Sequence, residues 1–299
     1  MSRKNIFELL ALNDNLEQKV DRVCALFNEK PLFNLDESEV CTLNEFVNCY
    51  CFKKWKNRGH CVDAFDFLAT IGYEKIVESS HKNINHFFIL MELVLNFWKM
   101  ADIYIKNQLD SICRYYVIYD DFNHLYNIII DYLSEYNQSF FYNEETEQVL
   151  VIEDKPEVTA VAEIIDEPLT LTVIRYNHHT MRGDLTSKKD TLLKLGSYLE
   201  GKRNTIHQIS PKLEDSIFFM LNNLNLRHNN CDPSLTKNYK KVVSEMTNET
   251  LEEWYDELYQ MILLVILEMD NKERMKKIDG LKKAITGGIN SWTKFKCNQ

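Results

Sequence analysis

The sequence predicts a mostly α-helical protein in which two helical domains are joined by a small β-hairpin. Only eight glycines and five prolines interrupt its 299 residues, and such a composition favours long helices with few turns. Apolar residues recur three and four positions apart through most of the chain, as they do on the buried face of a helix. The exception is a pair of β-forming segments, 139–142 and 148–153, that flank a polar turn.

The N-terminal domain is predicted to span residues 1–138 and to be helical. Two stretches carry the signature of a helix N-terminus, in which a polar capping residue is followed by a glutamate three positions later. These are Asp36 with Glu39 and Thr42 with Glu45, and either would open a helix that runs through residue 52. Further apolar periodicity predicts helices over residues 3–28 (a pair), 62–71, 83–105 and the tyrosine-rich 111–133.

Four residues of this domain invite comparison with a zinc site, because thiolates and imidazoles are the ligands that zinc prefers. They are Cys49, Cys51, His60 and Cys61. The sequence has no C-x-x-C pair, and residues two apart on a helix point to different faces. We therefore predict buried thiols and a loop histidine, with no bound metal and no other cofactor.

Residues 139–155 are predicted to be a hairpin and linker between the two domains. The C-terminal domain, 156–299, is predicted to be an antiparallel helical bundle with a basic tail. Pro156 lies at a favoured first helical position, and Thr250 with Glu253 belongs to a second capping signature. The predicted helices cover residues 156–166, 167–177, 184–208, 211–227, 235–246, 250–269 and 271–286.

The net charge of −10 argues against a surface coated with basic residues for general nucleic-acid binding. Residues 271–299 nevertheless hold eight lysines and arginines against two acidic residues. Such a tail can bind phosphate, although most basic helix ends are simply solvated.

The chain opens without a signal-peptide pattern, and its apolar runs are too short or too interrupted to cross a membrane. We therefore expect a cytoplasmic protein with reduced cysteines.

The candidate functional site is the stretch 221–230, where an apolar helical face ends in Arg227, His228, Asn229 and Asn230. Arginine carries a fixed positive fork that suits phosphate, and histidine exchanges a proton near neutral pH. Basic residues in a last helical turn also favour the helix dipole, and asparagine is a common cap. Both interpretations of this stretch are open.

Two further polar clusters lie in the same domain, at residues 175–184 and 202–207. Because successive helices of a bundle alternate in direction, the turn at 178–183 is expected at the same pole as 227–230, and the turn at 207–211 at the other. Arginine and histidine at one pole would suit RNA cleavage without a metal, which needs a base for the 2′-hydroxyl and a cation for the phosphate. The same clusters would also bind a phosphate without cutting it. The candidate catalytic residues are Arg227, His228 and Asn229, and the candidate substrate-binding residues are His178, His179, Arg182, Asn230, Lys237 and Tyr239.

The run from residue 173 to 283 resembles the HEPN domains of bacterial abortive-infection and toxin proteins. Residues 174–184, 193–203 and 221–230 carry the resemblance, which covers roughly residues 156–286. It implies a bundle of four to five helices, a homodimer through this bundle, and metal-independent endoribonuclease activity.

The usual motif of that family is an arginine and a polar residue, with a histidine after four to six intervening positions. After Arg227 those positions, 232–234, hold no histidine, while His228 follows directly. Arg203 and His207 are separated by only three residues. Two functions therefore stay open. One is a phage-defence endoribonuclease that acts on RNA through a variant site and responds to a phage or host trigger protein. The other is a non-catalytic helical protein that binds RNA, nucleotide or a protein partner.

Overall fold

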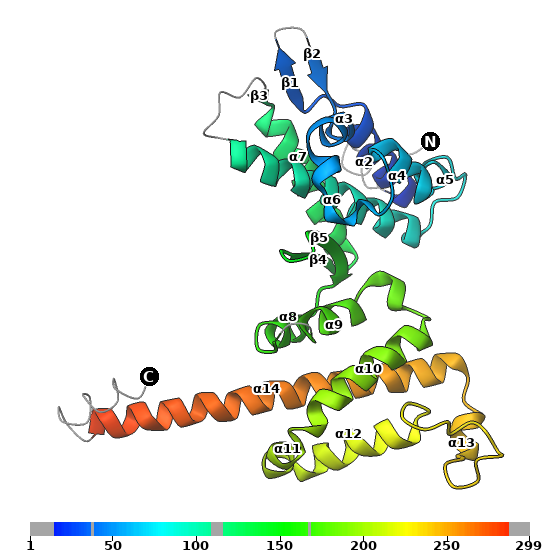
Figure 1. The fold of residues 1–299 in the computed structure, drawn as a ribbon, viewed down its shortest axis with the longest axis vertical. Coiled ribbons are helices and arrows are strands. Elements are labelled where there is room, and N and C mark those ends of the chain that lie inside the picture. Colours follow the sequence, from blue (N-terminus) through cyan, green and yellow to red (C-terminus); the bar gives the residue numbers. More distant parts are fainter. Residues whose placement is uncertain (1–14, 37–38, 109–115, 167–168, 287–299) are drawn as a thin grey trace, which may run out of the picture. The chain divides into compact units, whose positions relative to one another are not determined.

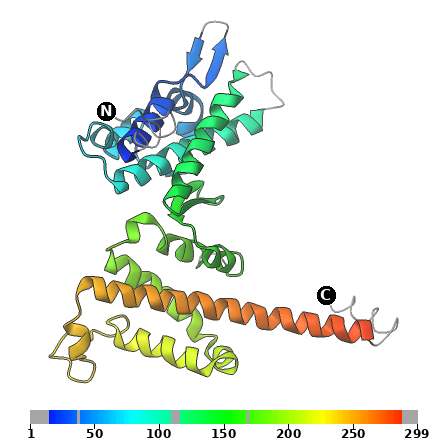
Figure 2. The same ribbon diagram turned by 180° about the vertical axis from the view of Figure 1, so that it is seen from behind.

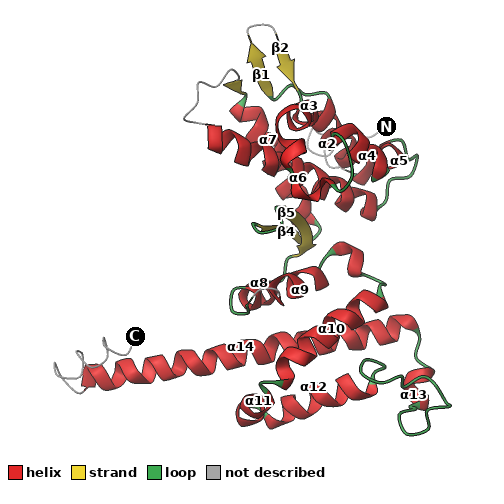
Figure 3. Cartoon of the chain, viewed as in Figure 1, coloured by secondary structure: helices red, strands yellow, loops and turns green. Residues whose placement is uncertain are grey.

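The computed structural model describes residues 15–36, 39–108, 116–166 and 169–286, and over these ranges the chain is mostly helical, as predicted (Figure 3). The chain divides into two compact units, Met1–Asp154 and Lys155–Gln299, which we call the first and the second unit. Parts of the helices predicted over 3–28 and 111–133 fall outside the described residues.

The first unit is organised around one long helix. Its elements are α2 (Leu16–Asn28), β1 (Phe33–Asp36), β2 (Glu39–Cys41), α3 (Leu43–Phe46), η1 (Val47–Cys51), η2 (Phe52–Lys54), η3 (Lys56–Arg58), α4 (Ala64–Thr70), α5 (Tyr73–Val77), α6 (Ile84–Gln108), β3 (Tyr116–Val117), α7 (Tyr119–Glu135), β4 (Gln138–Asn143) and β5 (Gln148–Glu153) (Figure 1). The central helix is α6, which contacts α2, α3, α5, α7 and β5. Phe97 of α6 stacks on Phe27 of α2 with ring centroids 5.3 Å apart. A helix with apolar residues on more than one face packs in this way at the centre of a domain.

A small antiparallel sheet in the first unit is not predicted by the sequence. Strand β1 lies between β2 and β3, and Phe33 pairs with Cys41 on one side and Val117 on the other. Asp36 and Glu39 therefore belong to strands, and the prediction that they open a helix is wrong. The pairing escapes prediction because each strand is short and one partner lies far along the chain.

The other predicted helix start is confirmed at Thr42. Its hydroxyl accepts a hydrogen bond from the backbone N–H of Glu45 at 3.3 Å, and the Glu45 carboxylate accepts one from the backbone N–H of Thr42 at 2.9 Å. The α-helix that follows is short, because the chain widens into a π-helix from Val47 to Cys51.

The cysteines next to this segment differ in exposure. Cys51 and Cys61 are buried, as predicted, whereas Cys49 is exposed, and its assignment to the core is wrong. Burial raises the pKa of the Cys51 thiol to about 12, so this thiol stays protonated at neutral pH. His60 is exposed in the loop before α4, as predicted.

The predicted hairpin forms, with residues 138–143 paired antiparallel to residues 148–153. Val149 and Val151 are buried in the core of the first unit. The backbone N–H and carbonyl of Val149 bind the side-chain amide of Asn96 of α6, at 2.9 and 3.0 Å. The hairpin is therefore an integral part of the first unit, which extends through it.

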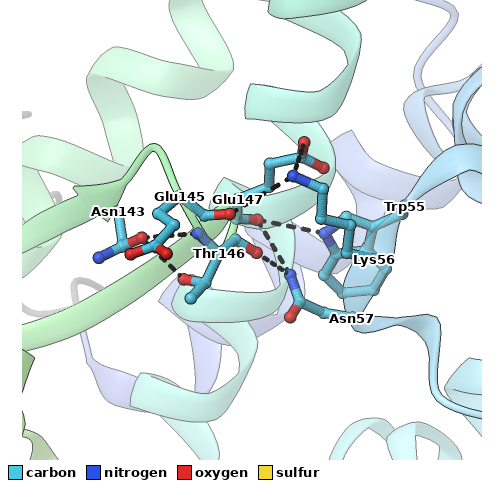
Figure 4. A network of polar contacts seen from close by, with 7 residues as sticks. All are labelled: Trp55, Lys56, Asn57, Asn143, Glu145, Thr146 and Glu147. Carbon is cyan, nitrogen blue, oxygen red and sulfur yellow. Dashed lines mark hydrogen bonds and ion pairs between the residues drawn. The ribbon is translucent and has the colours of Figure 1, made fainter. Parts of the chain in front are cut away.

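The turn of the hairpin is bound by side chains of the loop that begins at Trp55 (Figure 4). The Trp55 indole N–H donates to the carbonyl of Glu147 at 3.2 Å, and the Asn57 amide donates to the carbonyl of Thr146 at 2.6 Å. Within the turn, the Asn143 side chain accepts a hydrogen bond from the Thr146 N–H at 2.6 Å. These bonds give the turn's backbone groups partners that a two-stranded ladder alone does not supply.

The helices of the second unit pack against its last and longest helix. The elements are α8 (Pro156–Ala162), α9 (Leu169–Tyr176), η4 (His179–Met181), α10 (Leu185–Glu200), α11 (Arg203–Ile209), α12 (Pro211–Asn223), α13 (Lys241–Ser244) and α14 (Asn248–Thr286). Helix α14 contacts α8, α10, α11 and α12, and both views show it as one continuous rod (Figures 1 and 2). Its first half therefore supplies the core of this unit.

Several helix boundaries of the second unit differ from the prediction. The helix predicted over 184–208 is divided into α10 and α11 at residues 201–202, and the helix predicted over 235–246 is reduced to the single turn of α13. Conversely, the helices predicted over 250–269 and 271–286 form the continuous α14. Neither glycine nor proline lies at their junction, so nothing there breaks the helix.

A buried tyrosine of α14, Tyr259, connects this helix to α9. Its hydroxyl donates to the carbonyl of Val173 at 2.8 Å and accepts a hydrogen bond from the Asn177 amide at 2.7 Å. The Tyr259 ring also stacks on Tyr176, with centroids 4.0 Å apart. The Tyr259 hydroxyl thus binds both the carbonyl of Val173 in α9 and the amide of Asn177, the residue that follows α9.

We expect Tyr259→Phe to lower the free energy of unfolding by about 1–3 kcal/mol, because the buried Val173 carbonyl and Asn177 amide each lose a hydrogen bond and keep only their 3.3 Å contact with each other. Tyr198→Phe is the matched control, since the half-buried Tyr198 ring contacts Lys202 and its hydroxyl has no hydrogen-bond partner among the described residues. Urea unfolding followed by circular dichroism measures both effects. Equal destabilisation by the two substitutions would contradict the role given to the Tyr259 hydroxyl.

Candidate functional site

The turn between α9 and α10 carries three of the predicted site residues, and we call residues 178–182 the histidine turn. The Nδ1 atom of His178 accepts a hydrogen bond from the backbone N–H of Thr180 at 3.3 Å and so caps η4. The rings of His178 and His179 contact each other with centroids 4.3 Å apart. Arg182 is exposed. The turn thus presents two adjacent imidazoles and one cation.

A buried lysine of α10, Lys188, was not among the predicted residues. Its ammonium group lies 2.8 Å from Glu252 and 2.6 Å from Asp256 of α14, and the Tyr176 hydroxyl donates to Asp256 at 2.8 Å. Burial alone raises the pKa of Glu252, but hydrogen bonds from Lys188 and from the Gly183 N–H outweigh it, so this pKa lies below its usual value. The only signal in the sequence is the i, i+4 pair of carboxylates, which is also common on solvated helices.

Arg227 does not end a helix, so that prediction is wrong. Helix α12 ends at Asn223, and the chain turns at Asn225, whose φ of 55° is left-handed and is tolerated by asparagine. The Arg227 N–H then donates to the carbonyl of Leu221 at 3.1 Å. The guanidinium group binds the carboxylate of Glu200, at the end of α10, through two N–H groups at 2.6 and 3.4 Å.

A second arginine, Arg203 of α11, lies on the same aromatic ring as Arg227. The guanidinium carbons are 4.3 and 5.5 Å from the centre of the Phe218 ring, distances at which cation–π attraction acts. Arg203 also donates to the carboxylate of Glu214, and Nδ1 of His207 lies 3.3 Å from the other oxygen of that carboxylate. We call the whole group the arginine cluster: Glu200, Arg203, His207, Glu214, Phe218 and Arg227.

Glu214 is the buried centre of this cluster. Only 9% of its side chain is exposed, against 64% of the His207 side chain. Burial alone raises the pKa of Glu214, but hydrogen bonds from Arg203 and His207 together outweigh it, and the pKa lies below its usual value. Because an ionised carboxylate only accepts hydrogen bonds, Nδ1 of His207 carries the proton that faces it, and Nε2 is left for solvent. This is the arrangement of a histidine prepared for acid–base chemistry.

The arginine cluster and the histidine turn lie at opposite ends of α10. This helix has 16 residues, so its ends are about 24 Å apart. Asp184 caps the end next to the histidine turn, and Glu200 binds Arg227 at the other. The prediction that the Arg227 side chain shares a pole with His178, His179 and Arg182 is wrong, because the guanidinium group reaches along α10 to its C-terminal end.

The predicted site residues that follow Arg227 in the chain differ in solvent exposure. Asn230 is buried, and its side chain accepts the N–H of Asn225 at 2.8 Å and donates to the carbonyl of Asn238 at 2.7 Å. Its amide thus shapes the loop. The Tyr239 hydroxyl lies 3.1 Å from that of Ser244. The residues left exposed are His228, Asn229 and Lys237.

The first unit contains a cavity of about 340 Å³, a volume within the range of small-ligand sites. Its lining includes Tyr50 and Tyr104, whose ring centroids are 5.9 Å apart. It also includes Lys99, whose ammonium group lies 4.8 Å from the centre of the Tyr142 ring. Glu144 lines the same cavity. Because acidic and basic side chains share the lining, it selects no single class of charged ligand.

Comparison of the chain with protein-family models, with curated proteins and with solved structures gives no match in any of the three. Among the described helices, none combines the length and apolarity that a membrane span requires. We therefore infer function from the chemistry of the residues themselves.

Replacing Glu214 by glutamine keeps the shape of the side chain and removes its titration. Because the pKa of Glu214 is lower in the folded chain, its ionised form stabilises the fold above the usual glutamate pKa, and this contribution is lost as the pH falls through the lower folded-state value. We expect the stability advantage of wild type over Glu214→Gln to shrink on acidification through that window. Urea unfolding of both proteins across a pH series measures it, and a constant difference would contradict the assignment.

Proposed function

We propose that the second unit cleaves RNA without a metal ion, as a phage-defence endoribonuclease, and that the arginine cluster is its active site. One observation supports the proposal above the others. Two guanidinium groups share the ring of Phe218, and an imidazole shares the carboxylate that one of them binds. Metal-free cleavage needs such a set: a base for the ribose 2′-hydroxyl and cations for the charge that develops on the phosphate.

In this proposal His207 is the base. Its Nε2 takes the proton of the 2′-hydroxyl, while the carboxylate of Glu214 stabilises the imidazolium that forms. The 2′-oxygen attacks phosphorus, the bond from phosphorus to the 5′-oxygen breaks, and that oxygen takes a proton from the imidazolium or from water. The products are a 2′,3′-cyclic phosphate and a 5′-hydroxyl, and no cofactor takes part.

Arg203 and Arg227 hold the phosphate. The side chain of Arg203 is 51% exposed and that of Arg227 21%. Glu200, the carboxylate that Arg227 binds, is itself 51% exposed, and ion pairs between exposed groups contribute little to stability. A phosphate therefore replaces Glu200 at small cost, and the planar guanidinium group can bind it through two N–H groups.

The spacing of Arg203 and His207 also supports this site. Residues four apart on a helix share a face, and both side chains reach the carboxylate of Glu214. Three residues intervene, one fewer than in the usual HEPN motif, and we infer that the shared carboxylate takes the place of the longer spacing.

From the resemblance to HEPN domains we also propose a cytoplasmic role in abortive infection, with a phage or host protein as trigger.

A second function is favoured by a different observation on the same cluster. Each arginine is already bound to a carboxylate, Arg203 to Glu214 and Arg227 to Glu200. The cluster is thus close to neutral overall, which suits a non-catalytic domain that binds RNA, a nucleotide or a protein partner by shape more than by charge.

We expect the purified full-length protein to fragment RNA in the presence of EDTA. His207→Ala should lower the cleavage rate by about 10²–10⁴-fold, the usual contribution of a general base. His228→Ala is the matched control, because His228 is exposed and should leave the rate unchanged. Gel electrophoresis of a defined RNA measures all three proteins, and circular dichroism verifies that each is folded.

Two other outcomes would revise the proposal. If His228→Ala abolishes cleavage and His207→Ala does not, the active site is the loop at 227–229. If folded wild type cleaves nothing but binds RNA with an affinity that Arg203→Ala removes, the second function is the correct one. Fluorescence anisotropy at increasing salt detects this binding, because contacts to phosphate weaken steeply with salt.

A further inference from the structure

Five of the six large exposed apolar residues of α14 lie on one stripe, and Leu281 lies outside it. Trp254, Leu264, Met275, Ile278 and Ile285 are each between 42% and 62% exposed. They belong to a series that starts at Trp254 and ends at Ile285, in which successive positions are alternately four and three apart after an initial step of three. This is the spacing of a coiled-coil seam, which repeats every 3.5 residues.

The stripe is not the face of α14 that packs within the second unit. That face consists of buried residues such as Tyr255, Leu258, Ile262 and Ile266, and it meets α8, α10, α11 and α12. Beyond Ile266, Ala284 is the one buried residue among the described part of the helix. Figures 1 and 2 show this part extending past the other helices of the unit. Among the described helices of the second unit, none covers the exposed apolar residues of this stripe.

We propose that α14 pairs with the α14 of a second copy of this chain in the antiparallel direction. Aligning Leu264 with the partner's Met275 places each apolar position of the series opposite an apolar one, and each polar position opposite a complementary one. Two-fold symmetry makes every contact twice. The pairs are Trp254–Ile285, Glu257–Lys282, Met261–Ile278, Leu264–Met275 and Glu268–Asn271.

The charge of α14 selects the antiparallel direction. Residues 248–257 contain five acidic and no basic residues, whereas residues 272–283 contain six basic and two acidic ones. In the proposed alignment the acidic and basic parts meet where Asp256 and Glu257 lie opposite the partner's Lys283 and Lys282. In-register parallel pairing would instead place each acidic and each basic part against its own copy. Complementary charges flanking a seam set the direction of helix pairs in this way.

A hollow beside the stripe provides room for the partner's side chains. It measures about 310 Å³ and is lined by Met261, Leu264 and neighbouring residues of α14, together with Glu157 of α8. The partner's Ile278 and Met275 lie opposite this position in the proposed alignment. Apolar side chains that enter such a hollow resemble the knobs and holes of helix pairs.

The polar pair of the seam, Glu268 with the partner's Asn271, includes a buried carboxylate oxygen. One carboxylate oxygen of Glu268 is buried and has no hydrogen-bond partner among the described residues. Such an oxygen lowers stability until a donor reaches it. In the proposed alignment Glu268 lies opposite the partner's Asn271, whose side-chain amide is a hydrogen-bond donor of the kind this carboxylate needs.

Charge exchange at one pair tests both the contact and its direction. Glu257→Lys and Lys282→Glu each place like charges opposite each other twice per dimer, so each should raise the dimer dissociation constant about tenfold. The double variant should restore it. These residues are about 37 Å apart along one helix, so restoration cannot come from contact within a chain. Sedimentation of the full-length protein over a concentration series measures the constants.

Ile278→Lys, with Val242→Lys as its matched control, tests the apolar part of the seam. Both residues are exposed aliphatics of the second unit, at 42% and 71%, and only Ile278 lies on the stripe. We expect Ile278→Lys to be a folded monomer and Val242→Lys to dimerise like wild type.

A wild-type protein that stays monomeric throughout the concentration series would overturn the proposal. Single charge variants that dimerise like wild type would overturn the antiparallel direction. Neither result depends on RNA cleavage.

Discussion

The buried ammonium group of Lys188 is the interaction on which the arrangement of the second unit depends. Its side chain is 6% exposed, and it lies between Glu252 and Asp256. A buried charge is tolerated only with partners of this kind, and removal of one partner leaves the others uncompensated. The contact fixes the start of α10 against α14. It thereby sets where Glu200 lies at the far end of α10, and which face of α14 is left to solvent.

Helix content could be predicted because apolar periodicity is a local property. Thr42 with Glu45 shows this well, since both groups of the capping box lie within one turn of chain. The strands at Phe33 and Val117 could not be predicted, because their pairing depends on segments brought together by the rest of the first unit. The continuity of α14 is not predicted for the opposite reason: the composition changes from apolar to basic near residue 270, which resembles a boundary, although no residue there breaks a helix.

The residue types of the candidate site could be predicted, but their grouping could not. The sequence places Arg203 and Arg227 in separate clusters, and only the packing of α11 and of the loop after α12 against α12 brings both side chains to Phe218. Glu214 carries no signal in the sequence that separates it from other glutamates of an acidic chain. Its importance comes from burial, which periodicity assigns to apolar positions and not to a carboxylate at the start of a helix.

The pairing of Arg227 with Glu200 means that the site contains its own competing anion. In the proposed site, an anion that binds Arg227 has to replace a carboxylate that lies 2.6 Å from the guanidinium group and belongs to the same chain. A free monoanion replaces one such contact with another of similar strength and gains almost nothing. If the site binds RNA as proposed, a chain of phosphates that reaches Arg203 and Arg227 together would gain from both contacts, and the internal carboxylate would then favour polymers over mononucleotides.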